Sequence, residues 1–249
     1  LEAPPRITNF RERLALLAST GIDRVLVLKF NAELRDMSAE DFVSRVFVDG
    51  LGARYIALGD DFRFGNSREG DYDYVRRLAE QFDYEVQPTG TLEIGDARVS
   101  STRIRSALAE GHFTEVQALL GRPFTMTGRV EHGRKLGREL GAPTANIRIN
   151  RIRSPLSGVF AVRVDGPGLE SAAAVANVGT RPTVDDGLKA NLEVHLLDRQ
   201  CDLYGQRLEV RFLHKLREEI KYESLDALKE GIAKDIDNAR HWLGQPGHS

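Results

Sequence analysis

Cysteine is nearly absent from this sequence of 249 residues, and long apolar runs are absent altogether. The single cysteine, Cys201, cannot form a disulfide within the chain, which favours a reducing, cytoplasmic location. The longest apolar runs, at 14–18 and 172–176, are five residues long, whereas a membrane-spanning helix needs about 20. These absences exclude a disulfide-stapled scaffold and predict a protein with no membrane partner.

A strong net charge is also lacking. The chain has 35 basic and 37 acidic residues, a balance of −2, so no overall field attracts nucleic acid. One stretch, 128–153, departs from this balance with seven basic and two acidic residues, and it is the best candidate to meet an anion. A nucleic-acid-binding module on this stretch is the alternative, but only Phe124 and Phe160 flank it and no aromatic residues interleave. No pattern indicates the oligomeric state.

The first hundred residues alternate between helical and strand periodicity. Strand–helix–strand repetition with short apolar strands implies a parallel sheet covered by helices. The predicted helices cover 8–20, 38–50 and 71–82, and the predicted strands cover 24–30, 54–58 and 84–87.

The pattern changes near residue 121. Two helical stretches, 101–110 and 112–120, end in Leu-Gly-Arg-Pro, which is a helix stop followed by a proline. Short alternating segments separated by turns then predict an antiparallel barrel or sandwich, before a long amphipathic helix at 224–243. We therefore expect two domains, 1–121 and 122–249. The alternating segments are 124–131, 144–150, 158–164, 172–178, 191–197 and 207–213.

The densest chemical signal is a glycine-rich run at 128–141 that contains Lys135. Glycine allows backbone N–H groups to approach a phosphate closely because no Cβ intervenes. The run is not a true phosphate-binding P-loop, because no Lys-Ser or Lys-Thr follows its second glycine. The alternative is an ordinary hairpin loop with a solvated basic face. The glycines are Gly128, Gly133, Gly137 and Gly141.

Directly after this loop come Pro143, Thr144, Ala145 and Asn146. On a strand, residues two apart point the same way, so the Thr144 hydroxyl and the Asn146 carbonyl share a face. Both are oxygen ligands of the kind that Mg²⁺ prefers. This spacing favours a phosphate and magnesium site over a solvated hairpin.

Two further groups in the first half have polar side chains at places where anions and ligands bind. Ser100, Ser101 and Thr102, with Arg105 following, begin a predicted helix whose free N–H groups and dipole favour an anion. An ordinary helix cap is an equally good interpretation. The segment 60–62 follows a predicted strand, where ligands bind in open α/β sheets, although a polar turn would have the same composition.

Several motifs together resemble a known family. The glycine run ending in Pro143-Thr-Ala-Asn146 resembles the riboflavin kinase signature, and segments 177–183, 192–198, 203–205 and 216–219 match the same family in order. The first half resembles the FMN adenylyltransferase module that bacteria fuse to this kinase, through 59–65 and 99–105. The whole chain therefore resembles the bacterial bifunctional riboflavin kinase/FMN adenylyltransferases.

The resemblance implies a Rossmann-like nucleotidyltransferase domain at 1–121 and a six-stranded antiparallel barrel with a C-terminal helix at 122–249. It implies phosphorylation of riboflavin to FMN and adenylylation of FMN to FAD, with ATP and Mg²⁺. It makes Glu193 the catalytic base of the kinase, where the residues alone would favour an exposed strand carboxylate.

The remaining implied sites follow the same matches. ATP in the kinase would contact Gly128, Gly133, Lys135, Gly137, Gly141, Pro143, Thr144 and Asn146, with Thr144 and Asn146 on the metal, and the flavin would contact Arg217 and Glu219. In the adenylyltransferase, ATP would contact Ser100, Ser101, Thr102 and Arg105, and the flavin would contact Asp60, Asp61, Phe62 and Phe64.

The chain departs from the family at its start. The family opens with a strand and a loop whose two histidines face the ATP phosphates, and none of the six histidines here has that context. The chain begins at Leu1 in a loop-like Leu-Glu-Ala-Pro-Pro, so we expect an upstream segment and impaired adenylyl transfer by these 249 residues. The alternative is a riboflavin kinase whose first domain only scaffolds.

Overall fold

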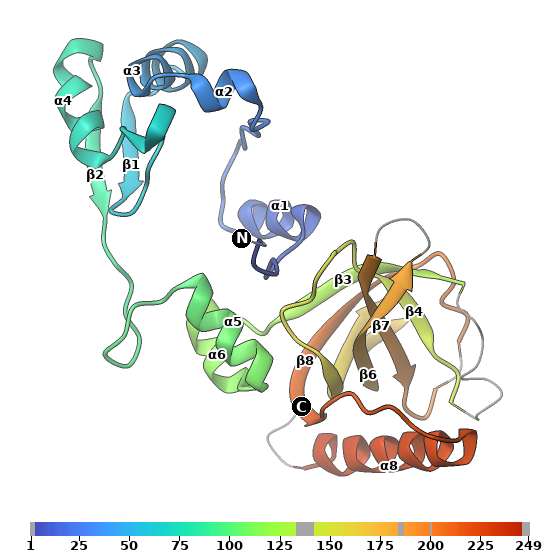
Figure 1. The fold of residues 1–249 in the computed structure, drawn as a ribbon. Coiled ribbons are helices and arrows are strands. Elements are labelled where there is room, and N and C mark those ends of the chain that lie inside the picture. The colour runs from blue at the N-terminus through green and yellow to red at the C-terminus, as the bar shows by residue number, and fades with distance from the viewer. Residues whose placement is uncertain (1–2, 133–141, 184–186, 200, 246–249) are drawn as a thin grey trace. The chain divides into compact units, whose positions relative to one another are not determined.

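The computed structural model describes residues 3–132, 142–183, 187–199 and 201–245, with the side chains of 180–189 also left undescribed. The chain forms two compact units, each with its own core (Figure 1). One unit is Asp23–Val99, and the other combines Leu1–Ile22 with Ser100–Ser249. No helix in the described part of the chain is long and apolar enough to cross a membrane.

The Asp23–Val99 unit holds a two-stranded parallel sheet. Strand β1 (Tyr55–Gly59) pairs with β2 (Glu85–Thr89), with Ile56 opposite Val86, which confirms the parallel arrangement that the sequence predicts. The helices are α2 (Ala32–Asp36), α3 (Ala39–Phe42), the π-helix η1 (Val43–Gly50), the 3₁₀ turn η2 (Asn66–Arg68) and α4 (Tyr72–Phe82).

The core of this unit is aromatic. Phe64 lies within 5.2 Å of Phe42 and 5.3 Å of Phe62, measured between ring centroids. Ser38 and Asp71 accept hydrogen bonds from the backbone of the first turns of α3 and α4, which fixes where these helices begin. The buried residues of the core are Ala39, Val43, Ile56, Leu58, Phe64, Val75 and Tyr84.

The predicted strand at 24–30 is wrong, because these residues form neither strand nor helix. Its large apolar side chains are exposed, from 43% at Leu28 to 77% at Phe30. A strand exists only through hydrogen bonds to a neighbouring strand, and among the described residues β1 and β2 pair only with each other. The apolar pattern alone therefore did not determine the conformation.

The larger unit contains a closed antiparallel barrel in the order β3-β4-β7-β6-β5-β8. This confirms the six-stranded barrel and excludes the sandwich alternative. Alternate residues of each strand fill the interior, where Phe124, Phe160 and Phe212 are the largest fully buried side chains. The strands are β3 (Thr125–Glu131), β4 (Ala145–Arg148), β5 (Gly158–Gly166), β6 (Leu169–Thr183), β7 (Gly187–Leu196) and β8 (Arg207–Arg217).

The described part of the barrel unit contains four helices. Helix α8 (Leu225–Leu243) packs on the outer face of β5, β6 and β8 (Figure 1). It buries Ala239 and Leu243 against Val159 and Val175. The helix predicted at 224–243 is thus confirmed. The others are α1 (Phe10–Ser19), α5 (Ser101–Glu110) and α6 (Phe113–Leu120).

Candidate active site

Four polar residues lie side by side across four strands of the barrel. Glu131 of β3 is opposite Asn146 of β4, Asn146 is opposite Glu193 of β7, and Glu193 is opposite Asn177 of β6. Residues directly opposite each other in antiparallel strands project from the same face. Their neighbours along the strands fill the barrel interior, so this polar row faces outward. The buried neighbours are Val130, Ile147, Leu192, Val194, Ala176 and Val178.

Two hydrogen-bond acceptors of the polar row have no donor among the residues that the structure describes. Asn191 donates through Nδ2 to Oε1 of Glu193 at 2.9 Å, which orients that carboxylate. The Oδ1 atoms of Asn146 and Asn177 are buried, and neither has a hydrogen-bond partner among the described residues. A buried acceptor without a partner costs free energy, so native proteins rarely leave two together. The pair fits a cation or a hydroxyl donor supplied by a ligand.

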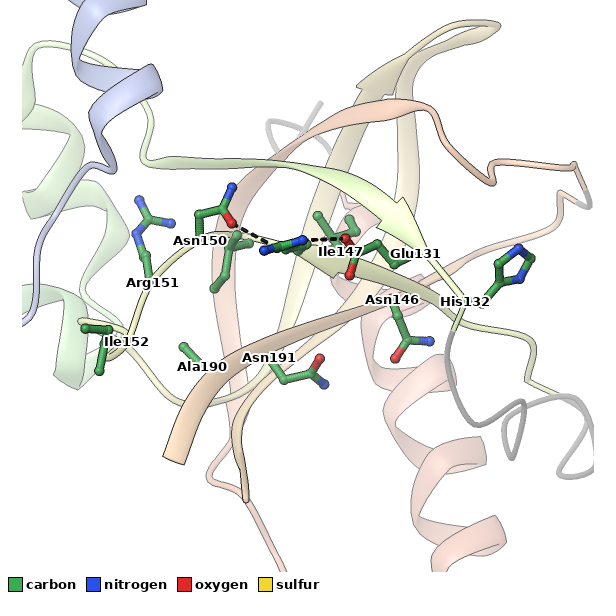
Figure 2. Close-up of a pocket in the computed structure, with 11 residues that line it drawn as sticks. Glu131, His132, Asn146, Ile147, Asn150, Arg151, Ile152, Ala190 and Asn191 are labelled. Atoms are coloured by element: carbon green, nitrogen blue, oxygen red, sulfur yellow. Dashed lines mark hydrogen bonds and ion pairs between the residues drawn. The ribbon is translucent and has the colours of Figure 1, made fainter. Parts of the chain in front are cut away.

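An open pocket of about 400 Å³ adjoins this row (Figure 2). Asn146 and Asn191 line it, and Arg148 donates to Glu131 at 3.2 Å and to Asn150 at 3.0 Å. Its lining is mainly polar, as a phosphate-bearing ligand requires. The lining residues are Glu131, His132, Asn146, Ile147, Arg148, Ile149, Asn150, Arg151, Ile152, Ala190 and Asn191.

The predicted ATP loop of the kinase lies mostly outside the described residues, including Gly133, Lys135, Gly137 and Gly141. Gly128 lies in the barrel wall, where a Cβ would overlap the carbonyl of Arg148. At the far end of the loop, Nδ1 of His195 lies 2.9 Å from the carbonyl oxygen of Pro143. With that nitrogen protonated, His195 donates to the carbonyl and fixes the start of the Pro143–Asn146 segment.

Sequence reasoning did not place Asn177, Asn191 or His195 in the site. Asn177 is the first residue of a matched motif, but only the strand register shows that it lies beside Glu193. His195 shares a strand face with Glu193, but a lone histidine is more often a structural hydrogen-bonding residue than a ligand-binding one.

The two predicted flavin residues of the kinase lie at and just after the end of β8, where Arg217 contacts α8 and Glu219 contacts β6. Arg217 makes a bidentate pair with the buried Asp235 of α8, at 2.8 and 2.6 Å, and this hydrogen bonding raises the pKa of the guanidinium. The pair holds β8 against α8. The carboxylate of Glu219 packs directly on Gly179, because a Cβ there would overlap it.

The predicted phosphate residues of the adenylyltransferase stand at the N-terminus of α5. Ser100 caps the helix, accepting from the N–H of Arg103 at 3.2 Å, while Ser101 and Thr102 are exposed on its first turn. Arg105 donates through Nε to the carbonyl of Pro5 at 2.8 Å.

The predicted flavin residues of the adenylyltransferase follow β1 in the other compact unit. Asp60 accepts from Thr91 Oγ1 and from Arg98, each at 3.1 Å, and these contacts lower the pKa of the Asp60 carboxyl. Asp61 accepts from the same Arg98 at 3.2 Å. Phe62 and Phe64 stack on each other, and Phe64 is buried in the core.

Two family models match successive parts of the chain. A model described as FAD synthetase matches residues 1–103, and one described as riboflavin kinase matches 120–243. Together with the barrel and the parallel α/β unit, these matches define a two-part enzyme of flavin nucleotide synthesis.

The relatives give the family itself. The chain is 48% identical to the bifunctional riboflavin kinase/FMN adenylyltransferase of Pseudomonas fluorescens, over 99% of this chain and 78% of that protein. It is 44% identical to the Escherichia coli K12 protein of the same name, over 98% and 77%. The chain belongs to the family of bifunctional riboflavin kinase/FMN adenylyltransferases.

One solved structure shares the fold over most of the chain. A crystal structure described as a macrolide-efflux protein from Streptococcus pneumoniae is 32% identical, with a TM-score of 0.77, and covers 95% of this chain and 76% of its own.

Proposed function

We propose that the barrel transfers the γ-phosphoryl group of Mg–ATP to the 5′-hydroxyl of riboflavin, giving FMN, and that the first part of the chain adenylylates FMN to FAD. The kinase domain would be 122–249, and the adenylyltransferase domain would be 1–121. The observation that carries the proposal is the polar row, in which Glu193 lies between two buried amide oxygens that have no hydrogen-bond partner in the part of the chain that the structure describes.

Glu193 would act as the general base. A free glutamate has a pKa of about 4.3, so it cannot deprotonate an alcohol beforehand. The transition state of phosphoryl transfer is loose, however, and the hydroxyl proton can leave late to a weak base that is well placed. The hydrogen bond from Asn191 supports this role, because it fixes the orientation of the carboxylate.

Thr144 and Asn146 would hold the magnesium ion. The buried Oδ1 of Asn146 fits a cation, and the half-buried Thr144 lies two residues earlier, directly before β4. Within the described residues no cluster of three or more His, Cys, Asp or Glu offers another metal site. When bound, the ion would neutralise charge on the phosphate oxygens. The exposed Cys201 supports a reducing, cytoplasmic setting.

For adenylyl transfer, the first turn of α5 would bind the ATP phosphates. Ser101 and Thr102 expose hydroxyls there, beside N–H groups at the positive end of the helix dipole. Asp60 and Asp61, held by Arg98, would lie on the flavin side. A riboflavin kinase whose first domain only scaffolds is the alternative.

A product assay with riboflavin, ATP and Mg²⁺, resolving FMN from FAD, tests both reactions. We expect FMN from the chain and loss of FMN formation in Glu193→Gln by about 10²–10⁴-fold, the range for a general base. Gln keeps the size of the side chain, so ADP binding and the melting temperature should stay near wild type. A second arm supplies FMN directly and measures FAD, which reports the first part of the chain alone.

A fall of less than about tenfold in Glu193→Gln would lie below the general-base range and remove Glu193 from the proposed role. FAD formation that matches FMN formation in rate would contradict the expected impairment and the scaffolding alternative together.

A further inference from the structure

The N-terminal arm, residues 5–20, is bonded to the barrel although the whole Asp23–Val99 unit separates them in sequence. Asn9 donates through Nδ2 to the carbonyl of Ile149 at 3.1 Å, and Arg151 donates to the carbonyl of Ile7 at 2.8 Å. The FAD synthetase model covers this arm, yet these bonds join it to the barrel, and the carbonyl of Pro5 also accepts from Arg105 of α5. The arm therefore packs on the part of the chain that the riboflavin kinase model matches.

The centre of this contact is a buried ion pair between Glu12 of α1 and Arg151. Their charged groups lie 2.5 Å apart, and the two side chains are only 5% and 2% exposed. Glu12 also accepts from the backbone N–H groups of Asn9, at 2.7 Å, and Thr127, at 2.8 Å. Removing one partner of such a pair leaves an uncompensated charge in the interior, so each partner holds the other in place.

Arg151 lies in the wall of the pocket beside the polar row (Figure 2). The next residue, Ile152, accepts through its carbonyl from the N–H of Ala190 at 3.2 Å. Asn191 follows directly and donates to the Glu193 carboxylate. A continuous path of backbone and hydrogen bonds thus leads from Glu12 to Glu193.

We propose that Glu12 and Arg151 are positioning residues of the kinase, fixing segment 149–152 and, through Ala190 and Asn191, the carboxylate of Glu193. The proposal rests on the role of Glu193 proposed above. It gives the arm a task in phosphoryl transfer, a reaction for which a displacement of about 1 Å can cost about 10²-fold in rate. The rival interpretation is that the pair only stabilises the barrel.

The test uses the full chain and measures kcat for FMN formation per ADP-binding site, with sites counted by calorimetric titration. The variants are Glu12→Gln, Arg151→Met and the double variant. Asp165→Asn is the matched control, because Asp165 also accepts from an arginine, Arg211, and from a backbone N–H, that of Ser171, but does not line the pocket. All assays run well below the lowest melting temperature.

We expect Glu12→Gln to lower kcat per site by about tenfold or more, while Asp165→Asn stays within about twofold of wild type. The double variant separates the two interpretations. It has no unpaired buried charge, so its melting temperature should rise above that of Arg151→Met. Positioning predicts that its kcat stays low, whereas recovery of kcat in step with the melting temperature would overturn the proposal.

If Glu12→Gln does not fold, Asn9→Ala carries the same test, since it removes the bond to Ile149 and keeps both charges; an unchanged kcat per site there would also overturn the proposal. Glu193→Gln in the same assay separates this proposal from the one on which it rests. Full activity in Glu193→Gln removes the proposed base. Loss of activity there, with normal kcat in Glu12→Gln, refutes only the positioning role.

Discussion

The two compact units differ in whether their strands have neighbours. In the barrel, each of the six strands is paired on both sides, so the sheet has no edge. In Asp23–Val99, β1 and β2 pair only with each other among the described residues, which leaves one open edge on each. The apolar segment 24–30 is exposed in the same unit. The two units therefore differ in whether every strand is paired on both sides, and apolar content alone does not account for that difference.

This difference has an energetic consequence. A two-stranded sheet is marginal by itself and depends on the helices that cover it. The barrel adds a second core on its outer face, where α8 packs, and the buried pair of Glu12 and Arg151. We therefore expect two thermal transitions, with Asp23–Val99 unfolding first and the barrel unit second.

The largest effect should come from Gly128→Ala in the barrel wall. A Cβ at this position meets the backbone of Arg148 on the neighbouring strand, which cannot move without opening the barrel. We expect the barrel transition to lose about 3 kcal/mol, at the upper end of overpacking costs. Differential scanning calorimetry resolves the transitions.

Gly70→Ala is the partner variant in the other unit, where the Cβ meets the ring of Phe64, a side chain that has some freedom to shift. It should lower only the first transition, by about 1–2 kcal/mol. If either variant shifts both transitions equally, the two units unfold as one and the comparison between them is wrong.

An intermediate effect should come from Asn146→Ala. This variant tests whether the residues needed for FMN formation are separate from those needed for FAD formation. Loss of the buried Oδ1 should raise the apparent KM for Mg–ATP in FMN formation by about tenfold, because the phosphates lose a metal ligand. Riboflavin affinity should change little, and FAD formation from supplied FMN should not change. Thr144→Ala should act in the same direction. Equal effects on both substrates would make this segment structural.

The same comparison shows how far sequence reasoning reaches. Alternation predicted all six barrel strands because closure gives each of them one buried face and two partners. The pattern of 24–30 is just as strand-like, yet the prediction failed, since a strand also needs hydrogen bonds to a neighbour, and 24–30 pairs with neither β1 nor β2 although each has an open edge. The alternation of apolar residues predicts which face of a segment would be buried. It does not predict whether a neighbouring strand will pair with that segment.

The candidate site divides in a similar way. Glu193 is a candidate because a motif of the resembling family contains it, and Asn146 is one because its spacing from Thr144 suits a magnesium site. Asn177 was missed as a site residue because only the register of β6 on β7 sets it beside Glu193. The pair of Glu12 and Arg151 joins residues 139 apart in sequence, and no local pattern links them. Strand register and contacts between residues far apart in the chain could therefore not be predicted from the sequence.

The smallest effect concerns Tyr84 in the Asp23–Val99 unit. Its hydroxyl donates to the carbonyl of Val75 at 2.6 Å, and burial raises its pKa from the ordinary 10.0 to about 12. Between these two values the unfolded unit has released the phenolic proton while the folded unit still holds it. The stability that Tyr84 contributes is therefore complete below pH 10 and is lost as the pH rises through about 12.

In Tyr84→Phe this contribution is gone, at a cost of about 1 kcal/mol at neutral pH for the lost hydrogen bond. The first transition should accordingly lie lower than in wild type at pH 8, and the gap should narrow between pH 10 and 12. All other titrating groups are common to the two proteins, so the difference between their melting curves isolates Tyr84. A gap that stays constant to pH 12, or one that appears in the barrel transition, would show that Tyr84 is not a buried, proton-holding residue of the smaller core.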